Sequence, residues 1–331
     1  MNGYKKITEC QIFLTRKCNI LCDYCKLTKK QFKNELTIEE WKNAFSVLDS
    51  LGIKTVKIMG GEPTVLNGLE ELLTHIRDNT DITCALLSNS LISEERIDSL
   101  IEAGLQGYFA SVDTIEKTSD ETSASEKKSH AGFTILKKMK SKGLRLLGAN
   151  VVITPQTLKV LPSLVQTLSD CGFWVNLCPI IYANNDHTDI EWEYRTKAEA
   201  EYCFTSADIP AINDTMIELL QMKNAGCKIA VPDSYLFNMS RYAIKCNWKC
   251  QDIVQLRIDA DGALMLCNDI RGEISQKYNI RNLTAETFEH FERDWMLERT
   301  KTDCPGCYWS CFYLANENIK QNRLEFHYLE D

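Results

Sequence analysis

Three cysteines stand close together near the start of the chain, in the segment Cys18-Asn19-Ile20-Leu21-Cys22-Asp23-Tyr24-Cys25. Thiolates select soft metals, and iron–sulfur clusters are held by cysteine. Three thiolates in so short a segment can hold three irons of a four-iron cube and leave the fourth iron open to an exogenous ligand. Zinc prefers four closed ligands, and this segment has no fourth cysteine or histidine. The spacing therefore favours a catalytic [4Fe–4S] cluster over a zinc site or a chance grouping.

A second group of cysteines lies in the last third of the chain, at Cys246, Cys250, Cys267, Cys304, Cys307 and Cys311. Eleven residues separate Cys250 from Gly262, four more precede Cys267, and Cys304 forms a CxxC pair with Cys307. Taken alone, such pairs are typical of a structural zinc site. A metal of either kind would stabilise a small domain that has little core of its own.

The elements that must position these cysteines show a regular alternation. Five helical patterns each end in a glycine that is followed at once by an apolar run, at Gly52, Gly104, Gly143, Gly172 and Gly226. A glycine after a helix supplies the left-handed cap, and the apolar runs are rich in β-branched and aromatic residues. We therefore predict βα units around a parallel sheet. The predicted strands lie near residues 9–14, 53–59, 82–88, 107–112, 145–153 and 173–181.

The pattern changes after about residue 235. Apolar and polar residues alternate over 254–258 and again over 264–266, with Asp261-Gly262 between the two runs. This predicts a β-hairpin with a type I′ turn, bracketed by cysteines. We therefore predict two domains, a core over 1–235 and a small metal-binding domain over 236–331.

The C-x3-C-x2-C spacing, with Asn19 after the first cysteine and Tyr24 before the third, resembles the radical S-adenosylmethionine (SAM) superfamily. In that family the three cysteines, here Cys18, Cys22 and Cys25, hold a [4Fe–4S] cluster whose open iron binds the amino and carboxylate groups of SAM. One electron then cleaves SAM to methionine and a 5′-deoxyadenosyl radical, which removes a hydrogen atom from the substrate. The resemblance implies an α/β fold, a partial (β/α)6 TIM-like barrel that is open on one side.

Further motifs at the predicted strand ends match the same family. Gly60-Gly61-Glu62-Pro63 resembles its GGEP segment, whose backbone and glutamate bind the SAM amino group, and Ser88-Asn89-Ser90 resembles its T/S-N-G element with serine in place of glycine. The resemblance also implies polar contacts to SAM from Ser111 and Asn150, and leaves the role of Asp113 open. The cofactor-binding residues that it implies are Tyr24, Gly60, Gly61, Glu62, Ser88, Asn89, Ser111 and Asn150.

The second cysteine group resembles the SPASM and twitch domains of radical SAM enzymes, which bind auxiliary [4Fe–4S] clusters. The full SPASM pattern supplies enough ligands for two clusters, whereas the six cysteines of this group cannot provide the eight that two clusters need. The resemblance therefore implies one auxiliary cluster. Its expected ligands are Cys250, Cys267, Cys304 and Cys307, with Cys246 and Cys311 as substitutes.

Bulk composition is ordinary for a globular protein, with 44% hydrophobic and 25% charged residues in 331. The net charge of −8 argues against a nucleic-acid partner. The sequence has no apolar stretch of signal-peptide or membrane-span length. We therefore expect a cytoplasmic protein without a membrane partner, in which fifteen reduced cysteines favour metal ligation over disulfides.

Three functions are compatible with these motifs. The first is modification of a ribosomally made peptide by crosslinking, thioether formation or epimerisation. The second is oxidation or rearrangement of a small molecule such as a sugar, nucleoside or cofactor precursor, and the third is a non-catalytic metal-binding scaffold. The resemblance favours an enzyme that takes electrons from a flavodoxin or ferredoxin, and we lean towards a peptide substrate. Because only about ten residues precede the first strand, peptide recognition would need a separate protein.

Cysteines outside the two groups have other expected roles. Some peptide epimerases of the superfamily use a cysteine as hydrogen-atom donor, and this resemblance makes Cys203 a candidate. Cys84 and Cys178 lie inside apolar strands, so we expect them to be small buried hydrophobic residues.

Overall fold

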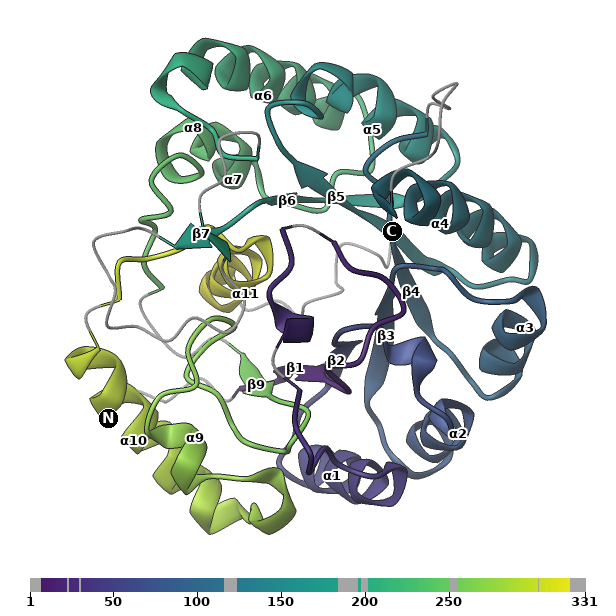
Figure 1. The fold of residues 1–331 in the computed structure, drawn as a ribbon, viewed down its shortest axis with the longest axis vertical. Coiled ribbons are helices and arrows are strands. Elements are labelled where there is room, and N and C mark those ends of the chain that lie inside the picture. The colour runs from purple at the N-terminus through teal and green to yellow at the C-terminus, as the bar shows by residue number, and fades with distance from the viewer. Residues whose placement is uncertain are drawn as a thin grey trace.

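The computed structural model describes the chain except for residues 1–6, 23, 30, 116–123, 184–195, 198–201, 251–254, 303 and 322–331. Within that part, seven parallel strands form one curved sheet in the order β6-β5-β4-β3-β2-β1-β9, and helices surround it (Figure 1). This architecture confirms the predicted partial TIM-like barrel. The strands are β1 (Glu9–Phe13), β2 (Thr55–Met59), β3 (Thr83–Ser88), β4 (Gly107–Ser111), β5 (Leu146–Ile153), β6 (Trp174–Pro179) and β9 (Leu256–Ile258).

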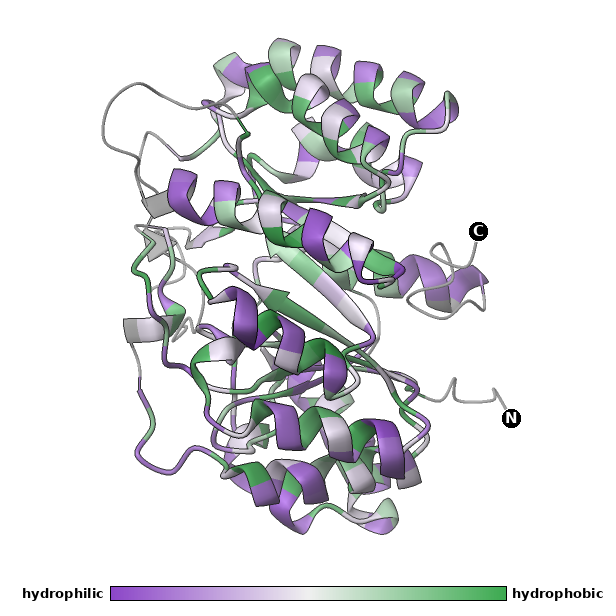
Figure 2. Cartoon of the chain, turned by 90° about the vertical axis from the view of Figure 1, so that its right-hand side faces the viewer, coloured by the Kyte–Doolittle hydropathy of each residue, from purple (hydrophilic) through white to green (hydrophobic). Residues whose placement is uncertain are grey.

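The helices between β1 and β6 form where their apolar residues share one face. In α1, Trp41, Phe45 and Leu48 are fully buried, and Thr37 and Glu40 form the predicted capping box. Hydrophobic residues concentrate in the strands and in the parts of the helices that pack on them (Figure 2). The helices that cover the sheet are α1 (Ile38–Ser50), α2 (Leu69–Asn79), α3 (Glu94–Glu102), α4 (Ala124–Ser141), α5 (Leu161–Asp170) and α6 (Ile209–Asn224).

The strands β1 to β6 match the six predicted ones, and their ends differ from the predicted ends by at most two residues. The five glycines that end the helical patterns all have positive φ, as their capping role requires. None of the helices in the described ranges is long and apolar enough to cross a membrane.

Besides these elements, the described part of the chain has two further strands and five further α-helices. A separate two-stranded sheet pairs β7 (Tyr182–Ala183) with β8 (Thr196–Lys197). The helix α11 is drawn near the centre of the molecule, inside the ring of outer helices (Figure 1). The five further helices are α7 (Asp233–Phe237), α8 (Met239–Tyr242), α9 (Ile274–Lys277), α10 (Ala285–Lys301) and α11 (Ser310–Gln321).

The predicted hairpin after residue 250 is present in the described residues, with hydrogen bonds from the Asp259 N–H to the Ala263 carbonyl and from the Met265 N–H to the Arg257 carbonyl, but its surroundings and its turn type differ from the prediction. Its first strand, β9, pairs in parallel with β1 and so becomes a seventh strand of the main sheet, where it satisfies the backbone of an edge that would otherwise be open. The chain does return in an antiparallel bridge between Ile258 and Leu264. The turn is not of type I′, however, because that type needs positive φ at both central residues and Asp261 does not have it, whereas Gly262 does. Residue 254 lies outside the described residues.

A buried ion pair connects β9 to the loop that follows β1. The Arg16 Nε atom donates to Oδ1 of Asp259 at 3.0 Å, and a terminal nitrogen of the same guanidinium donates to Oδ2. Both side chains are fully buried. Arg271 donates to the same carboxylate, and the Arg16 guanidinium lies 4.5 Å from the centre of the Phe32 ring. This contact holds the start of the cysteine loop against the C-terminal segment.

Replacing Asp259 with alanine should destabilise the protein strongly. The substitution leaves the Arg16 charge buried without its partner, which typically costs about 3–5 kcal/mol. Urea unfolding of the anaerobically purified protein measures the loss. Asp261→Ala is the matched control, because it removes the more accessible ion pair with Arg271 and one turn hydrogen bond from the Ala263 N–H, and should cost about 1 kcal/mol. Equal losses in the two variants would contradict the assignment.

Candidate active site

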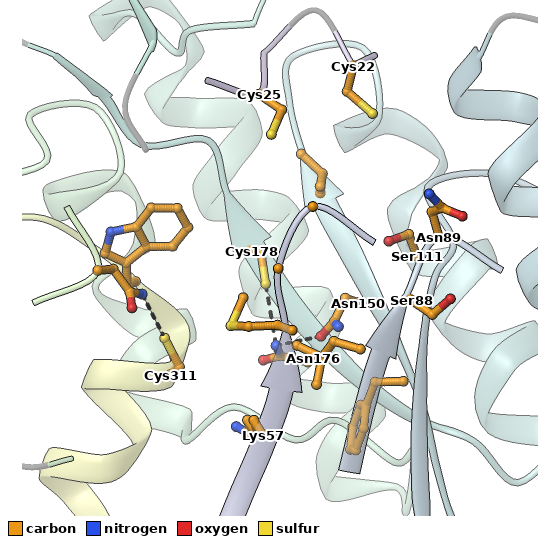
Figure 3. A pocket seen from close by; sticks show the side chains of 18 of the residues that line it. Cys22, Cys25, Lys57, Ser88, Asn89, Ser111, Asn150, Asn176, Cys178 and Cys311 are labelled. Carbon is orange, nitrogen blue, oxygen red and sulfur yellow. Dashed lines mark hydrogen bonds between the residues drawn. The ribbon is translucent and has the colours of Figure 1, made fainter. Parts of the chain in front are cut away.

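A cavity of about 250 Å³ lies at the carboxyl ends of the barrel strands. In Figure 3, Cys22 and Cys25 lie together at one end of this cavity, and Asn150 and Asn176 reach into it from the strands. The structure thus brings together every residue that the sequence predicted for the first cluster and for SAM. These lining residues are Cys18, Cys22, Tyr24, Cys25, Gly60, Gly61, Glu62, Ser88, Asn89, Ser111 and Asn150.

The three thiols of the first cysteine segment lie beside one another without meeting at a point. Burial is the largest cause that raises the pKa of Cys18 and of Cys25, so a bound cation is needed to hold them as thiolates. Among the described residues, no three metal-binding side chains converge where a single ion could sit. A four-iron cube needs no such point, because each thiolate binds its own iron. The donor set therefore fits an iron–sulfur cluster better than a single metal ion.

Two glycines after β2 allow the cysteine loop to lie against them. The Gly61 N–H donates to the Thr15 carbonyl and the Glu62 N–H to the Lys17 carbonyl, both at 2.8 Å. A Cβ atom would lie 2.3 Å from the Thr15 oxygen at Gly60 and 2.1 Å from the Lys17 oxygen at Gly61. The sequence analysis related these glycines to the close approach of a ligand. The contacts show that they are needed for the approach of the chain itself.

The carboxylate of Glu62 organises the next strand end. Its Oε1 accepts from the Thr64 hydroxyl at 2.7 Å and the Ser88 hydroxyl at 2.8 Å, and its Oε2 accepts from the Asn89 N–H at 2.6 Å. Burial raises the pKa of Glu62, and these hydrogen bonds oppose the shift. Glu62 is fully buried among protein atoms and lines the cavity. Oε1 also accepts from the Thr64 N–H at 3.1 Å, whereas Oε2 accepts a single bond from the described residues, so one of the two acceptor positions of Oε2 is left for another donor.

Ser90 explains why the related motif has glycine at this position. Its φ of +64° lies in the left-handed region, which residues with a Cβ resist. The Ser90 N–H donates to the Ser88 hydroxyl at 2.9 Å, and the Ser90 hydroxyl pairs with the Tyr108 hydroxyl at 2.8 Å. Asn89 is thereby turned so that its amide donates to the Cys18 sulfur at 3.7 Å.

Lys128 is a cavity residue that the sequence analysis missed. Its ammonium donates to the Tyr24 hydroxyl at 2.6 Å and lies 2.9 Å from the Asp113 carboxylate. Burial opposes its charge, but Asp113 and Tyr24 outweigh burial and raise the pKa of Lys128. Asp113, whose role was left open, therefore holds Lys128, and Lys128 holds Tyr24 in the cysteine loop. A lysine within a helix carries no motif that could have indicated this position.

Cys178 was expected to be a buried hydrophobic residue, and the structure corrects this. It lines the cavity at the end of β6, where its sulfur accepts from the Asn176 amide at 3.3 Å and pairs with the Ser310 hydroxyl at 3.4 Å. Burial raises its pKa to about 12. Cys84 is buried as expected. Cys203 is buried near Tyr182 and is not among the described residues that line the cavity.

The four preferred cysteines of the second group surround a smaller cavity of about 20 Å³, which Cys250, Cys267, Cys304 and Cys307 all line. An Arg299 nitrogen lies 3.9 Å from the Cys250 sulfur and lowers the pKa of that thiol against the larger effect of burial. Four soft donors with a compensating cation, which do not converge on one point in the described structure, fit an iron–sulfur cluster, in which each thiolate binds its own iron. The two substitutes lie elsewhere, because Cys246 packs in the core and Cys311 lines the large cavity.

Comparison with known proteins identifies the first half of the chain. Residues 12–168 match the family model described as the Radical SAM superfamily. A probable GTP 3′,8-cyclase of Methanopyrus kandleri is 29% identical over 50% of this chain and 54% of its own length. A PqqA peptide cyclase of Bradyrhizobium diazoefficiens is 30% identical over 47% of this chain and 42% of its own. The chain thus spans about half the length of these two relatives.

Two further similarities extend over more of the chain. A probable GTP 3′,8-cyclase of Pyrococcus horikoshii is 25% identical over 89% of this chain and 95% of its own length. The structure titled native anSMEcpe with bound AdoMet and Cp18Cys peptide superposes with a TM-score of 0.60 at 16% identity, over 97% of this chain and 96% of that chain. At that identity the superposition establishes the fold.

Gly61→Ala should displace the cysteine loop, because the new Cβ would lie 2.1 Å from the Lys17 oxygen. We expect the iron content of the anaerobically reconstituted protein to fall by about four atoms per chain, as one [4Fe–4S] cluster is lost. Gly143→Ala is the control, since a Cβ there meets nothing within 4 Å and costs only the roughly 1–2 kcal/mol of a left-handed backbone. Unchanged iron in Gly61→Ala would refute the close-approach argument.

Proposed function

We propose that the chain is a radical SAM enzyme and uses residues 12–168, which match the Radical SAM superfamily model, to modify a ribosomally made peptide. The observation that carries this proposal is that the cysteine segment, the Gly-Gly-Glu segment and the polar ends of β3, β4 and β5 all line one cavity. A [4Fe–4S] cluster with bound SAM supplies one-electron cleavage of the SAM carbon–sulfur bond and, with it, removal of a hydrogen atom from a substrate. Cys18, Cys22 and Cys25 would hold the cluster.

The chain's own groups complete such a site. Oε2 of Glu62 has an acceptor position left for an amino group, and Asn89 orders the strand end beside the Cys18 sulfur. Ser111 and Asn150 would contact the ribose or methionine part of SAM from the ends of β4 and β5. Lys128 keeps Tyr24 against the cavity wall. These contacts exist before any ligand binds, so the protein supplies a preorganised frame.

The charge of the cavity supports a peptide rather than a nucleotide triphosphate. Its described lining contains no arginine and has two lysines, of which Lys128 is neutralised by Asp113. Phosphate groups are usually bound by several arginines or lysines. The neutral amides of Asn150, Asn176 and Asn268 suit a substrate of low charge. A PqqA peptide cyclase is among the relatives, and the structure that superposes over 97% of this chain holds a peptide.

A small-molecule substrate is the second candidate. The observation that favours it is the match to the probable GTP 3′,8-cyclase of P. horikoshii over 89% of this chain. In either case, Cys250, Cys267, Cys304 and Cys307 would hold one auxiliary [4Fe–4S] cluster, which could accept an electron from the substrate.

The proposal includes a low-potential flavodoxin or ferredoxin as electron donor and a cytosolic location, where thiols stay reduced.

The anaerobically reconstituted protein should convert SAM to 5′-deoxyadenosine when dithionite supplies the electron. Cys18→Ala should abolish this conversion, because it removes one of three thiolates that hold the cluster. Cys227→Ala is the control, since Cys227 lies outside both cavities and should leave the rate unchanged. Chromatography of the products measures the conversion. A Cys18→Ala protein that cleaves SAM at the wild-type rate would contradict the proposal. Deuterium transfer from labelled peptides or GTP into 5′-deoxyadenosine would then separate the two substrate classes.

Iron analysis should give about eight atoms per chain for two [4Fe–4S] clusters. Cys267→Ala should reduce this to about four, because Cys267 lines the small cavity, whereas Cys246→Ala should retain about eight. About four irons together with one zinc in the wild type would defeat the auxiliary-cluster assignment while leaving the first cluster in place.

A further inference from the structure

One wall of the large cavity comes from the C-terminal segment and has no role in the proposed SAM site. In Figure 3, Cys311 lies across the cavity from Ser88, Asn89 and Ser111. Ser310 and Cys311 begin α11, so the wall includes a helix N-terminus, where the first N–H groups have no partner within the helix. The residues of this wall are Asn268, Trp309, Ser310, Cys311 and Leu314.

Asn268 is the unusual member of this wall. Its side chain is 4% exposed, and its amide nitrogen donates to the Cys311 sulfur at 3.5 Å. Its Oδ1 is buried and accepts no hydrogen bond in the described part of the chain. An unsatisfied buried acceptor costs about 1–3 kcal/mol, and native proteins seldom leave one. Because Asn268 lines the cavity, a ligand there lies next to this side chain, and a rotation of the amide would let Oδ1 accept from a ligand donor and offset that cost.

The groups beside Asn268 are hydrogen-bond donors, whereas Asn268 offers an acceptor. The Ser310 hydroxyl and the first N–H groups of α11 are donors, and they lie on the same wall as the Asn268 acceptor. A ligand that satisfies both presents an N–H and a C=O side by side and carries no charge, because the described residues of this wall are all uncharged. A peptide bond has this pattern. Apolar residues elsewhere in the lining of the same cavity would accept a substrate side chain, namely Met59, Leu87, Phe109, Val152 and Leu314.

We propose that Asn268 and the first turn of α11 bind a main-chain amide of the substrate, with Asn268 Oδ1 accepting from its N–H and α11 donating to its C=O. This inference rests on the proposed peptide substrate. Asn268 is then a substrate-binding residue that hydrogen bonds to the peptide backbone. Specificity for the substrate's side chains comes from the apolar lining of the cavity.

The test measures binding of a small uncharged probe to the full reconstituted chain with SAM, by ligand-observed NMR. The probe is N-acetyl-leucine N′-methylamide, and its partner is the analogue in which both N–H groups are methylated. The wild type should bind the N–H probe at least about fivefold more tightly than the methylated analogue. Asn268→Leu and Asn268→Ala should abolish this preference, whereas Asn268→Asp should keep it because a carboxylate also accepts.

Asn316→Leu is the matched control, since Asn316 is buried on the same helix but does not line the cavity. It should keep the preference. The inference fails if the wild type shows no preference for the N–H probe, or if both Asn268→Leu and Asn268→Ala keep it. It also fails if GTP binds and displaces the probe from this wall. SAM cleavage measured on the same samples distinguishes failure of this inference from failure of the proposed function. Cleavage without a preference for the N–H probe refutes this inference alone, whereas absence of cleavage in the wild type refutes the proposed function.

Discussion

The buried ion pair between Arg16 and Asp259 is the contact on which the rest of the structure depends. Arg16 lies two residues before Cys18, and Asp259 follows β9 and precedes Cys267 by eight residues. One carboxylate therefore ties the loop that leads from β1 to the first cysteines to the segment that leads from β9 to Cys267. The cost of burying these charges is repaid only when the bidentate geometry is complete. Both cysteine groups thus reach their places only if the two halves of the chain have come together.

The same principle of close approach operates at the strand ends. Absence of a Cβ at Gly60 and Gly61 lets the cysteine loop hydrogen bond to the segment after β2, and Glu62 then ties that segment to the end of β3. Each contact uses backbone groups or buried carboxylate oxygens that have few alternative partners. The frame of the cavity is consequently rigid where a cofactor would bind, and its conformational entropy is lost on folding instead of on binding.

The elements that sequence reasoning identified are those with a local signal. Helical period, apolar runs and glycine caps located β1 to β6, and motif spacing located the residues of the SAM side of the cavity. The pairing of β9 with β1 joins segments more than 240 residues apart and leaves no local trace. Lys128 gave no signal either, because its burial depends on Asp113 and Tyr24. The position of Cys178 did have a local signal. Asn176 lies two residues earlier on the same face of β6 and marks that face as polar, and therefore as part of the cavity wall.

The two cavities share a single described residue, Trp309. Its indole N–H donates to the Asp269 carboxylate at 2.7 Å, and the Asp269 N–H donates to the Cys267 sulfur at 3.4 Å. The small thiol cavity and the substrate wall are therefore one hydrogen-bonded unit, not two neighbouring features. A metal that holds Cys267 as a thiolate would strengthen the bond from the Asp269 N–H to the Cys267 sulfur, because a charged acceptor binds its donor more tightly. It would thereby order Asp269 and, through it, Trp309. Under the proposals made above, metal binding at the second thiol site would therefore help to order the wall that carries Asn268.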